Sequence, residues 1–500
     1  MTTIAQTEQG KLQGSQENGV TVFRGVRYAQ APLGQLRFRA PQAPESWQSV
    51  RAAEEFGPIS LQRPNEALDA LVGGLPQEQS EDCLYLNIWT PALDDARRPV
   101  MVWIHGGAFT IGSGSEIYYD GSALASRGDV VVVTINYRLG ALGFLHLPAL
   151  GETNFGMRDQ VAALGWVRQN IANFGGDPDN VLIFGESAGG MSCGSLMGSP
   201  EANGLFHKAI PQSGAGHHGM ALETAEANGR KFAAFLGVDP DDAEAMRSAD
   251  AADILAASVQ LEDTMFEAMA LGQPPEMPLR PVVDGAFLEA MPIDAIQSGQ
   301  AAGVATLVGN LDEEAKLFGA MIPAAPLTEE DVVARIGFMH PDGQSAYERY
   351  HEARSGRGED ASADEINDAV QGDYTFRVPT VRLATAQAQH NPNTYVYLFD
   401  WKSPGLDGAL GSCHALDIPF VFGTHGSTPD FAGSGPDADA LAEATMDAWI
   451  AFARSGNPSS GGVDWPSWDP DEQEITVLGH GVRTESAFRA EEIATWDGVL

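Results

Sequence analysis

The chain carries few positive charges. Lysine and arginine together number 29, against 68 aspartate and glutamate residues, so the formal net charge is −39. A surface of this sign repels nucleic acid and anionic lipid, and we expect neither nucleic acid nor a membrane as a partner. Only five lysines are present in the 500 residues: Lys11, Lys208, Lys231, Lys316 and Lys402.

Cysteine is also scarce, and long apolar segments are missing. Cys83, Cys193 and Cys413 are too few and too widely spaced for a disulfide framework or a zinc site, so we expect buried free thiols and no metal. No stretch approaches the roughly 20 apolar residues of a membrane span. The first residues, MTTIAQTEQGKLQG, show neither a basic nor an apolar signal region, which predicts a cytoplasmic protein.

Apolar runs rich in β-branched residues alternate with helical patterns along most of the chain. One helical pattern covers residues 154–174 and is followed by a predicted turn at Asp177-Pro178. Such alternation predicts an α/β fold with a large, mostly parallel central sheet. The apolar runs span residues 84–90, 100–106, 130–138, 181–185, 207–214, 303–309 and 394–401.

Two segments interrupt this alternation. Residues from about 220 to 300 and from about 324 to 390 are rich in Ala, Asp and Glu and have largely helical patterns. We expect them to be helical insertions that cap the carboxyl edge of the sheet, within a single domain covering residues 1–500. We further expect a monomer or a weak oligomer.

A candidate nucleophile follows the apolar run that ends at residue 184. Residues 185–189 read GESAG and match G-x-S-x-G, in which a sharp strand-to-helix turn exposes the serine, here Ser187. A second match, residues 190–194, places Ser192 one turn into the expected helix. The alternative interpretation of Ser187 is an ordinary helix N-cap.

A glycine-rich turn provides candidate oxyanion donors. The sequence His105-Gly106-Gly107-Ala108-Phe109 directly follows a predicted strand. Small residues allow backbone N–H groups to approach a developing oxyanion, and the amide of Ala188 is a further donor.

A serine nucleophile also needs an orienting acid and a base, which in this type of site follow the serine in that order. Asp312, Glu313 and Glu314 come after the run at 303–309, and position alone does not choose among them. Among the later histidines, His414 and His425 shortly follow the run at 394–401. We favour His414, because His425 lies in a Gly-, Ser- and Pro-rich stretch that is poorly suited to holding an imidazole. The remaining histidines after the acid are His340, His351, His390 and His480.

Several long motifs resemble the type-B carboxylesterases, the family that includes the cholinesterases, and in particular its bacterial para-nitrobenzyl esterases. The resemblance covers residues 14–468. The motifs are PLGQLRFRAP at 32–41, EDCLYLNIW at 81–89, WIHGGAF at 103–109, NYRLGALGFL at 136–145, GMRDQVAALGWVRQNIANFGGDPDNVLIFGESAGG at 156–190 and CHALDIPFVFG at 413–423.

The resemblance implies an α/β-hydrolase fold and ester hydrolysis through an acyl-enzyme, with no cofactor. Ser187 takes the position of the nucleophile and His414 that of the base. Glu314 takes the position of the acid, with Ala315 where the family has glycine, and Glu313 is the alternative. The resemblance places the oxyanion donors at Gly107, Ala108 and Ala188.

The resemblance also identifies neighbours of this site and supporting residues. Gly106, Glu186 and Ser213 are expected beside the reacting groups. Arg37 and Glu81 match a structural ion pair. Cys83 matches the first cysteine of a family disulfide, but no cysteine precedes it here, so that bridge cannot form.

Together these features predict a serine carboxylesterase acting on neutral esters. The alternatives are a lipase-like hydrolase of longer-chain glycerides, whose pocket walls would include residues 262–279, and a non-catalytic binding module on the same fold. Residues 64–80 contain no Trp, Tyr or Phe, so we expect no aromatic cage for choline there and a poorly ordered loop.

Overall fold

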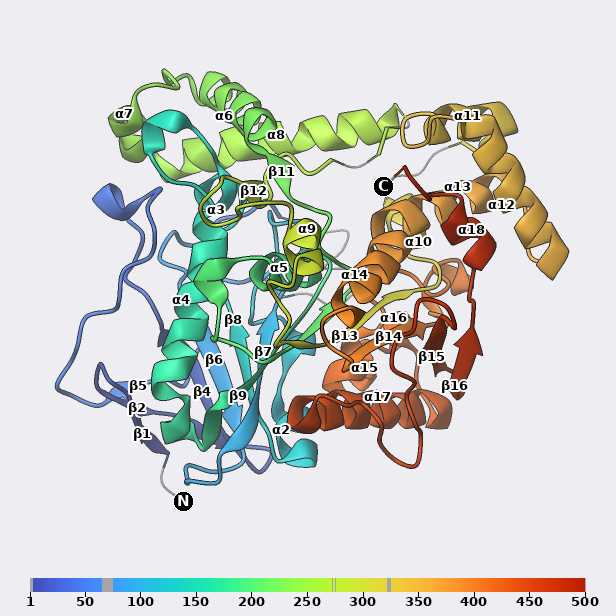
Figure 1. The fold of residues 1–500 in the computed structure, drawn as a ribbon. Helices are drawn as coiled ribbons and strands as arrows, with labels where there is room; N and C mark the ends of the chain where they lie inside the picture. The colour runs from blue at the N-terminus through green and yellow to red at the C-terminus, as the bar shows by residue number, and fades with distance from the viewer. Residues whose placement is uncertain (1–2, 65–74, 272, 275, 322–324, 500) are drawn as a thin grey trace.

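The computed structural model describes residues 3–64, 75–271, 273–274, 276–321 and 325–499. An 11-stranded sheet runs through its middle, and the expected loop at 64–80 lies mostly outside the described residues (Figure 1). The strands of this sheet, from one edge to the other, are β16 (Gly481–Ser486), β15 (Glu474–Gly479), β14 (Thr394–Phe399), β13 (Ala305–Leu311), β10 (Lys208–Gln212), β9 (Gly176–Glu186), β7 (Arg98–Ile104), β8 (Val131–Ile135), β6 (Tyr85–Thr90), β4 (Val20–Arg27) and β3 (Ser15–Glu17).

Seven neighbouring strands, from β8 to β15, pair in parallel, and the antiparallel pairs lie toward the two edges. This confirms the predicted large, mostly parallel sheet. Successive side chains of a strand point to opposite faces, and β7 shows this directly. Val100, Val102 and Ile104 join one apolar core, whereas Met101 and Trp103 join a second core on the other face.

Helices cover both faces of the sheet. The first core also takes in side chains from α4 (Phe155–Asn170), α5 (Ala188–Met197) and α14 (Val378–Ala388). The second takes in side chains from α2 (Ser122–Gly128) and α17 (Pro436–Ser455). Apolar runs buried on both faces are typical of parallel sheets between two helical layers, which explains why the strands were readable as continuous apolar stretches.

Two strand boundaries differ from the sequence expectation. The turn predicted at Asp177-Pro178 is instead part of β9, which begins at Gly176 and pairs with Arg98 before a shift in register. The hairpin of β15 and β16 was not predicted at all. In β16 no side chain is fully buried, so its sequence lacks the apolar run that marks the central strands.

The two expected insertions are largely helical, and most of their helices lie in the upper part of Figure 1, whereas α9 (Pro292–Gln297) and α14 lie in the middle of the view. In the first insertion, α8 (Ala251–Ala270) contacts α3 (Gly140–Phe144), a helix that follows the carboxyl end of β8. In the second, α14 contacts β13 and β14, so this helix belongs to the layer beside the sheet rather than to a cap. The other helices of the insertions are α6 (Leu222–Leu236), α7 (Ala243–Ser248), α9 (Pro292–Gln297), α11 (Glu329–Ile336), α12 (Gly343–Arg357) and α13 (Ala363–Gly372).

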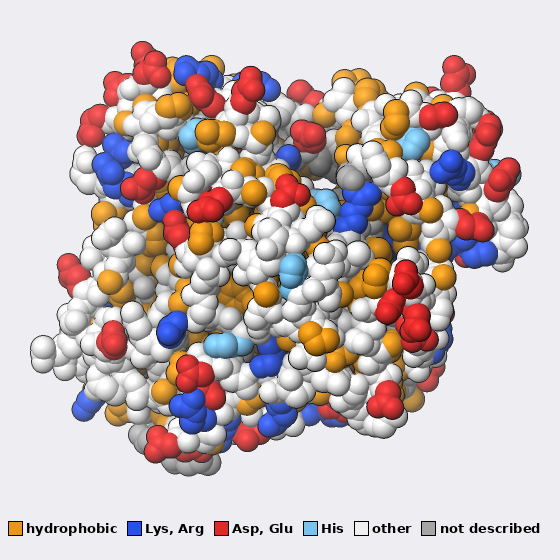
Figure 2. Space-filling model, viewed as in Figure 1, with side chains coloured by type: hydrophobic (Ala, Val, Ile, Leu, Met, Phe, Trp, Pro, Cys, Tyr) orange, Lys and Arg blue, Asp and Glu red, His pale blue; other side chains and the backbone are white. Residues whose placement is uncertain are grey.

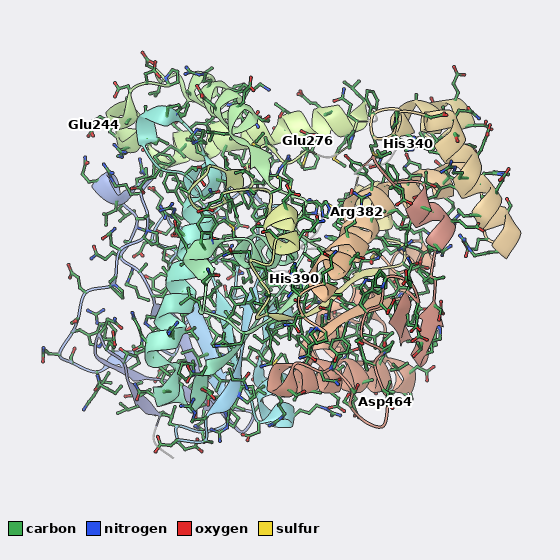
Figure 3. The ribbon with its side chains drawn as sticks, in the orientation of Figure 1. Glu244, Glu276, His340, Arg382, His390 and Asp464 are labelled. Atoms are coloured by element: carbon green, nitrogen blue, oxygen red, sulfur yellow. The ribbon has the colours of Figure 1, made fainter. Side chains whose placement is uncertain are left out.

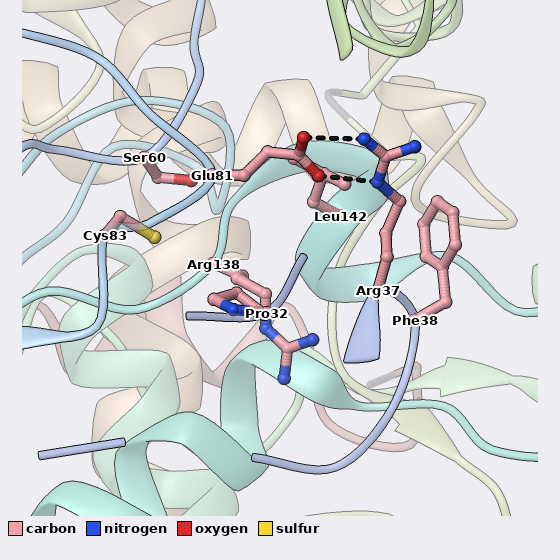
Figure 4. Close-up of a pocket in the computed structure, with 8 residues that line it drawn as sticks. All are labelled: Pro32, Arg37, Phe38, Ser60, Glu81, Cys83, Arg138 and Leu142. Carbon is pink, nitrogen blue, oxygen red and sulfur yellow. Dashed lines mark hydrogen bonds and ion pairs between the residues drawn. The ribbon is translucent and has the colours of Figure 1, made fainter. Parts of the chain in front are cut away.

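The predicted ion pair between Arg37 and Glu81 is present and buried (Figure 4). Arg37 Nε and Nη2 donate to the two carboxylate oxygens of Glu81, each at 2.6 Å. Its Nη1 donates to the carbonyl oxygens of Arg247 and Ala249, so the pair ties the N-terminal region to α7 and the start of α8. Cys83 lies near this pair, and it is free and buried, as are the other two cysteines.

The visible surface carries acidic side chains over all of its parts, many beside Lys or Arg side chains (Figure 2). Within the described ranges, no helix is long and apolar enough to cross a membrane. In the same part of the chain, no group of three or more His, Cys, Asp or Glu side chains is arranged to hold a metal ion.

Candidate active site

Ser187 occupies a sharp turn between β9 and α5. Its backbone angles, φ 55° and ψ −123°, are rare for a residue with a side chain and are the kind of strain that collects at functional sites. The Ser187 N–H donates to the carbonyl oxygen of Gln212 at 2.9 Å, which ties the turn to the end of β10. Ser187 accepts no backbone N–H with its side chain, so it is not an ordinary N-cap.

Glycines around Ser187 are required by close backbone packing. A Cβ on Gly185 would lie 2.5 Å from the carbonyl oxygen of Ile104, and one on Gly189 would overlap the same oxygen. A Cβ on Gly190 would lie 2.5 Å from the carbonyl oxygen of Gln212. Only glycine allows β7, β9, β10 and α5 to approach this closely.

The second G-x-S-x-G match has a different environment. Ser192 lies inside α5 and is fully buried, and its Oγ accepts a hydrogen bond from Gln160 Nε2 at 3.1 Å. Its hydroxyl also contacts the sulfur of Met157. Ser192 is therefore a core serine without access to a substrate.

The glycine-rich turn after β7 lies directly against the elbow. A Cβ on Gly106 would lie 2.7 Å from the Glu186 carbonyl oxygen and 3.1 Å from Ser187 Cβ. Gly107 and Ala108 have φ angles of 102° and 52°. Among the hydrogen bonds of the described residues, none uses the N–H groups of Gly107, Ala108 or Ala188. These donors are therefore free to bind an oxygen beside Ser187.

Glu314 and His414 are in direct contact. Glu314 follows β13, His414 follows β14, and these strands pair in parallel, so both residues emerge at the same edge of the sheet. His414 Nδ1 lies 2.6 Å from Glu314 Oε2. Ser213 Oγ and the Leu311 N–H donate to Glu314 Oε1 at 2.6 and 2.8 Å. Glu314 is only 2% exposed, so three donors replace the water its carboxylate lost.

The neighbouring carboxylates point elsewhere. Glu313 accepts from Lys316 Nζ at 2.8 Å and from Lys402 Nζ at 2.5 Å. Asp312 forms ion pairs with Arg377 and Arg489. Of the three acids that the sequence left open, the structure places only Glu314 against His414.

The other candidate histidines are bound outside this contact. His425 Nε2 lies 2.9 Å from Asp439 Oδ1. His340 and His390, labelled in Figure 3, face the backbone carbonyl oxygens of Thr495 and Gln297 through Nε2. None of these rings reaches Glu314.

Glu186 lies on the opposite side of the His414 ring. Its Oε1 is 3.0 Å from His414 Nε2, and both side chains are buried. Burial raises the pKa of Glu186 to about 8. Burial alone would lower the pKa of His414, but Glu186 and Glu314 together raise it to about 9. Each of these two groups therefore affects the protonation of the other.

No hydrogen bond joins Ser187 Oγ to His414 among the described residues, because Nε2 faces the residue just before the serine. Hydrogen bonds of this kind are often long in unliganded enzymes and tighten when substrate binds.

Sequence reasoning missed three residues around His414. The rings of Phe318 and Phe376 pack against it, with centroid separations of 5.0 and 4.7 Å. Asp417 is fully buried beside the site and accepts from Gln212 Nε2 and Tyr397 Oη. Burial raises the pKa of Asp417 to about 6. The sequence signal that could have identified Asp417 is its position three residues after His414, at the start of an apolar stretch.

Comparison with known proteins places the chain in a family. The model of the carboxylesterase family matches residues 1–496. The para-nitrobenzyl esterase of Bacillus subtilis is 38% identical over 98% of this chain and 97% of its own length. The phenmedipham hydrolase of Pseudarthrobacter oxydans is 36% identical over 99% and 98%. A solved carboxylesterase structure from Geobacillus stearothermophilus superimposes with a TM-score of 0.87 at 38% identity, covering 99% of this chain and all of the other. The chain therefore belongs to the carboxylesterase family and has its α/β-hydrolase fold.

Proposed function

We propose that this protein hydrolyses neutral carboxylic esters through an acyl-enzyme formed on Ser187. Family membership makes it a carboxylic ester hydrolase. The observation that carries the assignment of residues is the 2.6 Å contact between His414 and Glu314 at the sheet edge that also presents Ser187. A buried carboxylate on one ring nitrogen fixes the tautomer in which the other nitrogen is a base.

In the first half of the reaction, Ser187 Oγ attacks the carbonyl carbon of the ester. His414 Nε2 takes the hydroxyl proton, and Glu314 stabilises the imidazolium that results. The N–H groups of Gly107, Ala108 and Ala188 bind the oxyanion of the tetrahedral intermediate. The imidazolium then returns the proton to the alkoxide, the C–O bond breaks, and the alcohol leaves.

In the second half, water attacks the acyl-enzyme and His414 again takes a proton. The oxyanion collapses, the bond to Ser187 Oγ breaks, and the serine regains its proton as the carboxylic acid departs. Every proton moves through His414, so the reaction needs no metal or organic group.

We favour neutral esters because the site holds the buried carboxylate of Glu314 and the whole chain has a net charge of −39. An anionic acyl group would be repelled on approach and inside the site. The single-domain organisation, the cytoplasmic location and the weak or absent oligomerisation stay predictions.

The test is covalent labelling together with substitution. A para-nitrophenyl phosphonate should modify Ser187, identified by peptide mass spectrometry, and Ser187→Ala should abolish both labelling and hydrolysis of para-nitrophenyl acetate. Ser192→Ala is the matched control and should keep most activity. Label on Ser192, or full activity of folded Ser187→Ala, would overturn the assignment.

A further inference from the structure

Glu314 and His414 lie on two loops that the sequence keeps 100 positions apart. We define the acid loop as residues 312–315, between β13 and α10 (Lys316–Met321). The histidine loop comprises residues 400–417, between β14 and α15 (Ile418–Phe422). Parallel pairing of β13 and β14 brings the loops to one edge but does not set the geometry between their tips. That geometry must come from contacts between the loops.

Glu313 makes most of those contacts. Its N–H donates to the Ser412 carbonyl oxygen at 3.0 Å, and its carboxylate Oε2 accepts from the Ser412 N–H at 2.7 Å. Ser412 is two residues before His414. Among the described residues, one other hydrogen bond between backbone atoms joins the two loops. It runs from the His414 N–H to the Glu314 carbonyl oxygen at 3.3 Å.

Two lysines complete the contact, one on each side. Lys402, in the histidine loop, donates to Glu313 Oε2 at 2.5 Å, and Lys316, at the end of the acid loop, donates to Oε1 at 2.8 Å. Two of the five lysines in this acidic chain thus bind one carboxylate. Glu313 and Lys316 are partly shielded from water, with side chains 23% and 18% exposed, whereas the Lys402 side chain is 49% exposed.

The backbone of the histidine loop is shaped around this carboxylate. Gly411 has φ 55°, and a Cβ there would overlap Glu313 Oε2. A side chain at position 411 would therefore push the carboxylate away from the Ser412 N–H. The loop leaves room for Glu313 at the cost of requiring glycine at this position.

We propose that Glu313 is a positioning residue, which clamps the histidine loop onto the acid loop through Ser412 and Lys402 and so fixes His414 against Glu314. The inference rests on the proposed function, because it gives Glu314 and His414 their roles. Glu313 touches neither substrate nor the reacting atoms in this arrangement. It acts on the reaction only through the distance between two other side chains.

Glu313→Gln tests the clamp. The amide oxygen still accepts from the Ser412 N–H, but both lysines lose their ion pair with residue 313, so the loops should loosen. We expect kcat per labelled active site to fall about tenfold with little change in KM, since small displacements of catalytic groups are costly. The acid limb of the pH profile of kcat/KM should move to lower pH, because a weaker contact with Glu314 raises the His414 pKa less.

Lys402→Met separates positioning from a simple effect of charge. The groups that face His414 electrostatically include Glu186, Glu314 and Asp417. Removing a distant negative charge would itself lower the His414 pKa, so Glu313→Gln alone is ambiguous. Removing the positive charge of Lys402 would raise that pKa through space, whereas a loosened clamp lowers it. We expect the acid limb of Lys402→Met to move to lower pH, as in Glu313→Gln.

Glu365→Gln is the matched control. Glu365 binds the same Lys316, at 3.1 Å, and also Arg354, but none of its hydrogen bonds or ion pairs reaches the histidine loop. Its kcat and acid limb should remain those of the unsubstituted protein. The proposed clamp is contradicted if Glu313→Gln keeps full kcat and an unchanged acid limb in its pH profile. It is also contradicted if the acid limb of Lys402→Met moves to higher pH. In either case, phosphonate labelling of Ser187 would still stand and the proposed function would be unaffected.

Discussion

The elbow around Ser187 and the loops that carry Glu314 and His414 achieve precision in different ways. The elbow is one continuous stretch, and backbone packing shapes it: Gly185, Gly189 and Gly190 lie against carbonyl oxygens that leave no space for a Cβ. The acid and histidine loops are distant in sequence, and ion pairs and hydrogen bonds of side chains join them. Close steric packing leaves no space for an added atom. A set of charged contacts, by contrast, loses its hold step by step as single contacts are removed.

The largest expected effect lies in the loops. Glu314→Gln presents an amide to His414 Nδ1, Ser213 Oγ and the Leu311 N–H, all three of which are donors. We expect kcat to fall about 10⁴-fold, as when a comparable triad acid is replaced by its amide. Steady-state kinetics on para-nitrophenyl acetate, normalised by phosphonate titration, measure it. A greater loss in Glu313→Gln than in Glu314→Gln would make Glu313 the triad acid.

The second effect tests the steric character of the elbow. In Gly189→Ala the new Cβ overlaps the Ile104 carbonyl oxygen, so β7 and α5 must separate. We expect a loss of about 1–3 kcal/mol in the free energy of unfolding from the overpacking. Displacement of Ser187 should also cost about 100-fold in kcat. Urea unfolding and kinetics report the two quantities.

Gly165→Ala is the control for that substitution. Gly165 lies inside α4, and no atom stands within 4 Å of its missing Cβ. Alanine should therefore stabilise the protein by about 0.5–1 kcal/mol and leave kcat unchanged. Equal behaviour of the two variants would show that packing does not set the elbow.

A third, smaller effect concerns Glu186, which belongs to the elbow in sequence and to His414 in space. Burial has the largest effect on the pKa of His414 and lowers it. Glu186 has the next largest effect and raises this pKa. Glu186→Gln removes this influence, so neutral His414 should persist to lower pH. The acid limb of kcat/KM should then move to lower pH, and activity at pH 6 relative to pH 9 should rise. An unmoved or upward-shifted limb would contradict the assignment of this contact.

The smallest effect concerns the alcohol part of the ester and residues 64–80, most of which lie outside the described residues. Residues 64–80 have no aromatic side chain, so no cation–π contact of about 2 kcal/mol can arise there. We expect kcat/KM for a choline ester and for its neutral carbon isostere to agree within about twofold in high salt, where attraction to the acidic surface is screened. A choline preference that persists in high salt would require an aromatic cage elsewhere in the chain.

Much of the fold was predictable because its signals are local. The central strands are buried on both faces and appear as apolar runs, so β6, β7, β8, β10, β13 and β14 fall where they were expected. The edge hairpin of β15 and β16 was missed because β16 is largely exposed and has no such run. The residues in β9 at Asp177-Pro178 resembled a turn because Pro and Asp favour turns, yet pairing with β7 near the register shift extends the strand through them.

By itself, the sequence determined the elbow and the glycine turn. Ser187, Gly106 and Gly107 are recognisable because the steric demand and the residues that meet it are neighbours in the chain. The residues alone left Asp312, Glu313 and Glu314 open, and they gave no indication that Glu186 faces His414. Tertiary structure decided both points. Parallel pairing of β13 with β14 brings the acid and histidine loops to one edge, and contacts between the loops decide which carboxylate reaches the histidine. Burial of Glu186 beside Nε2 places a second acid on the ring. Contacts between side chains 100 or more positions apart depend on how the sheet assembles, which no local pattern records.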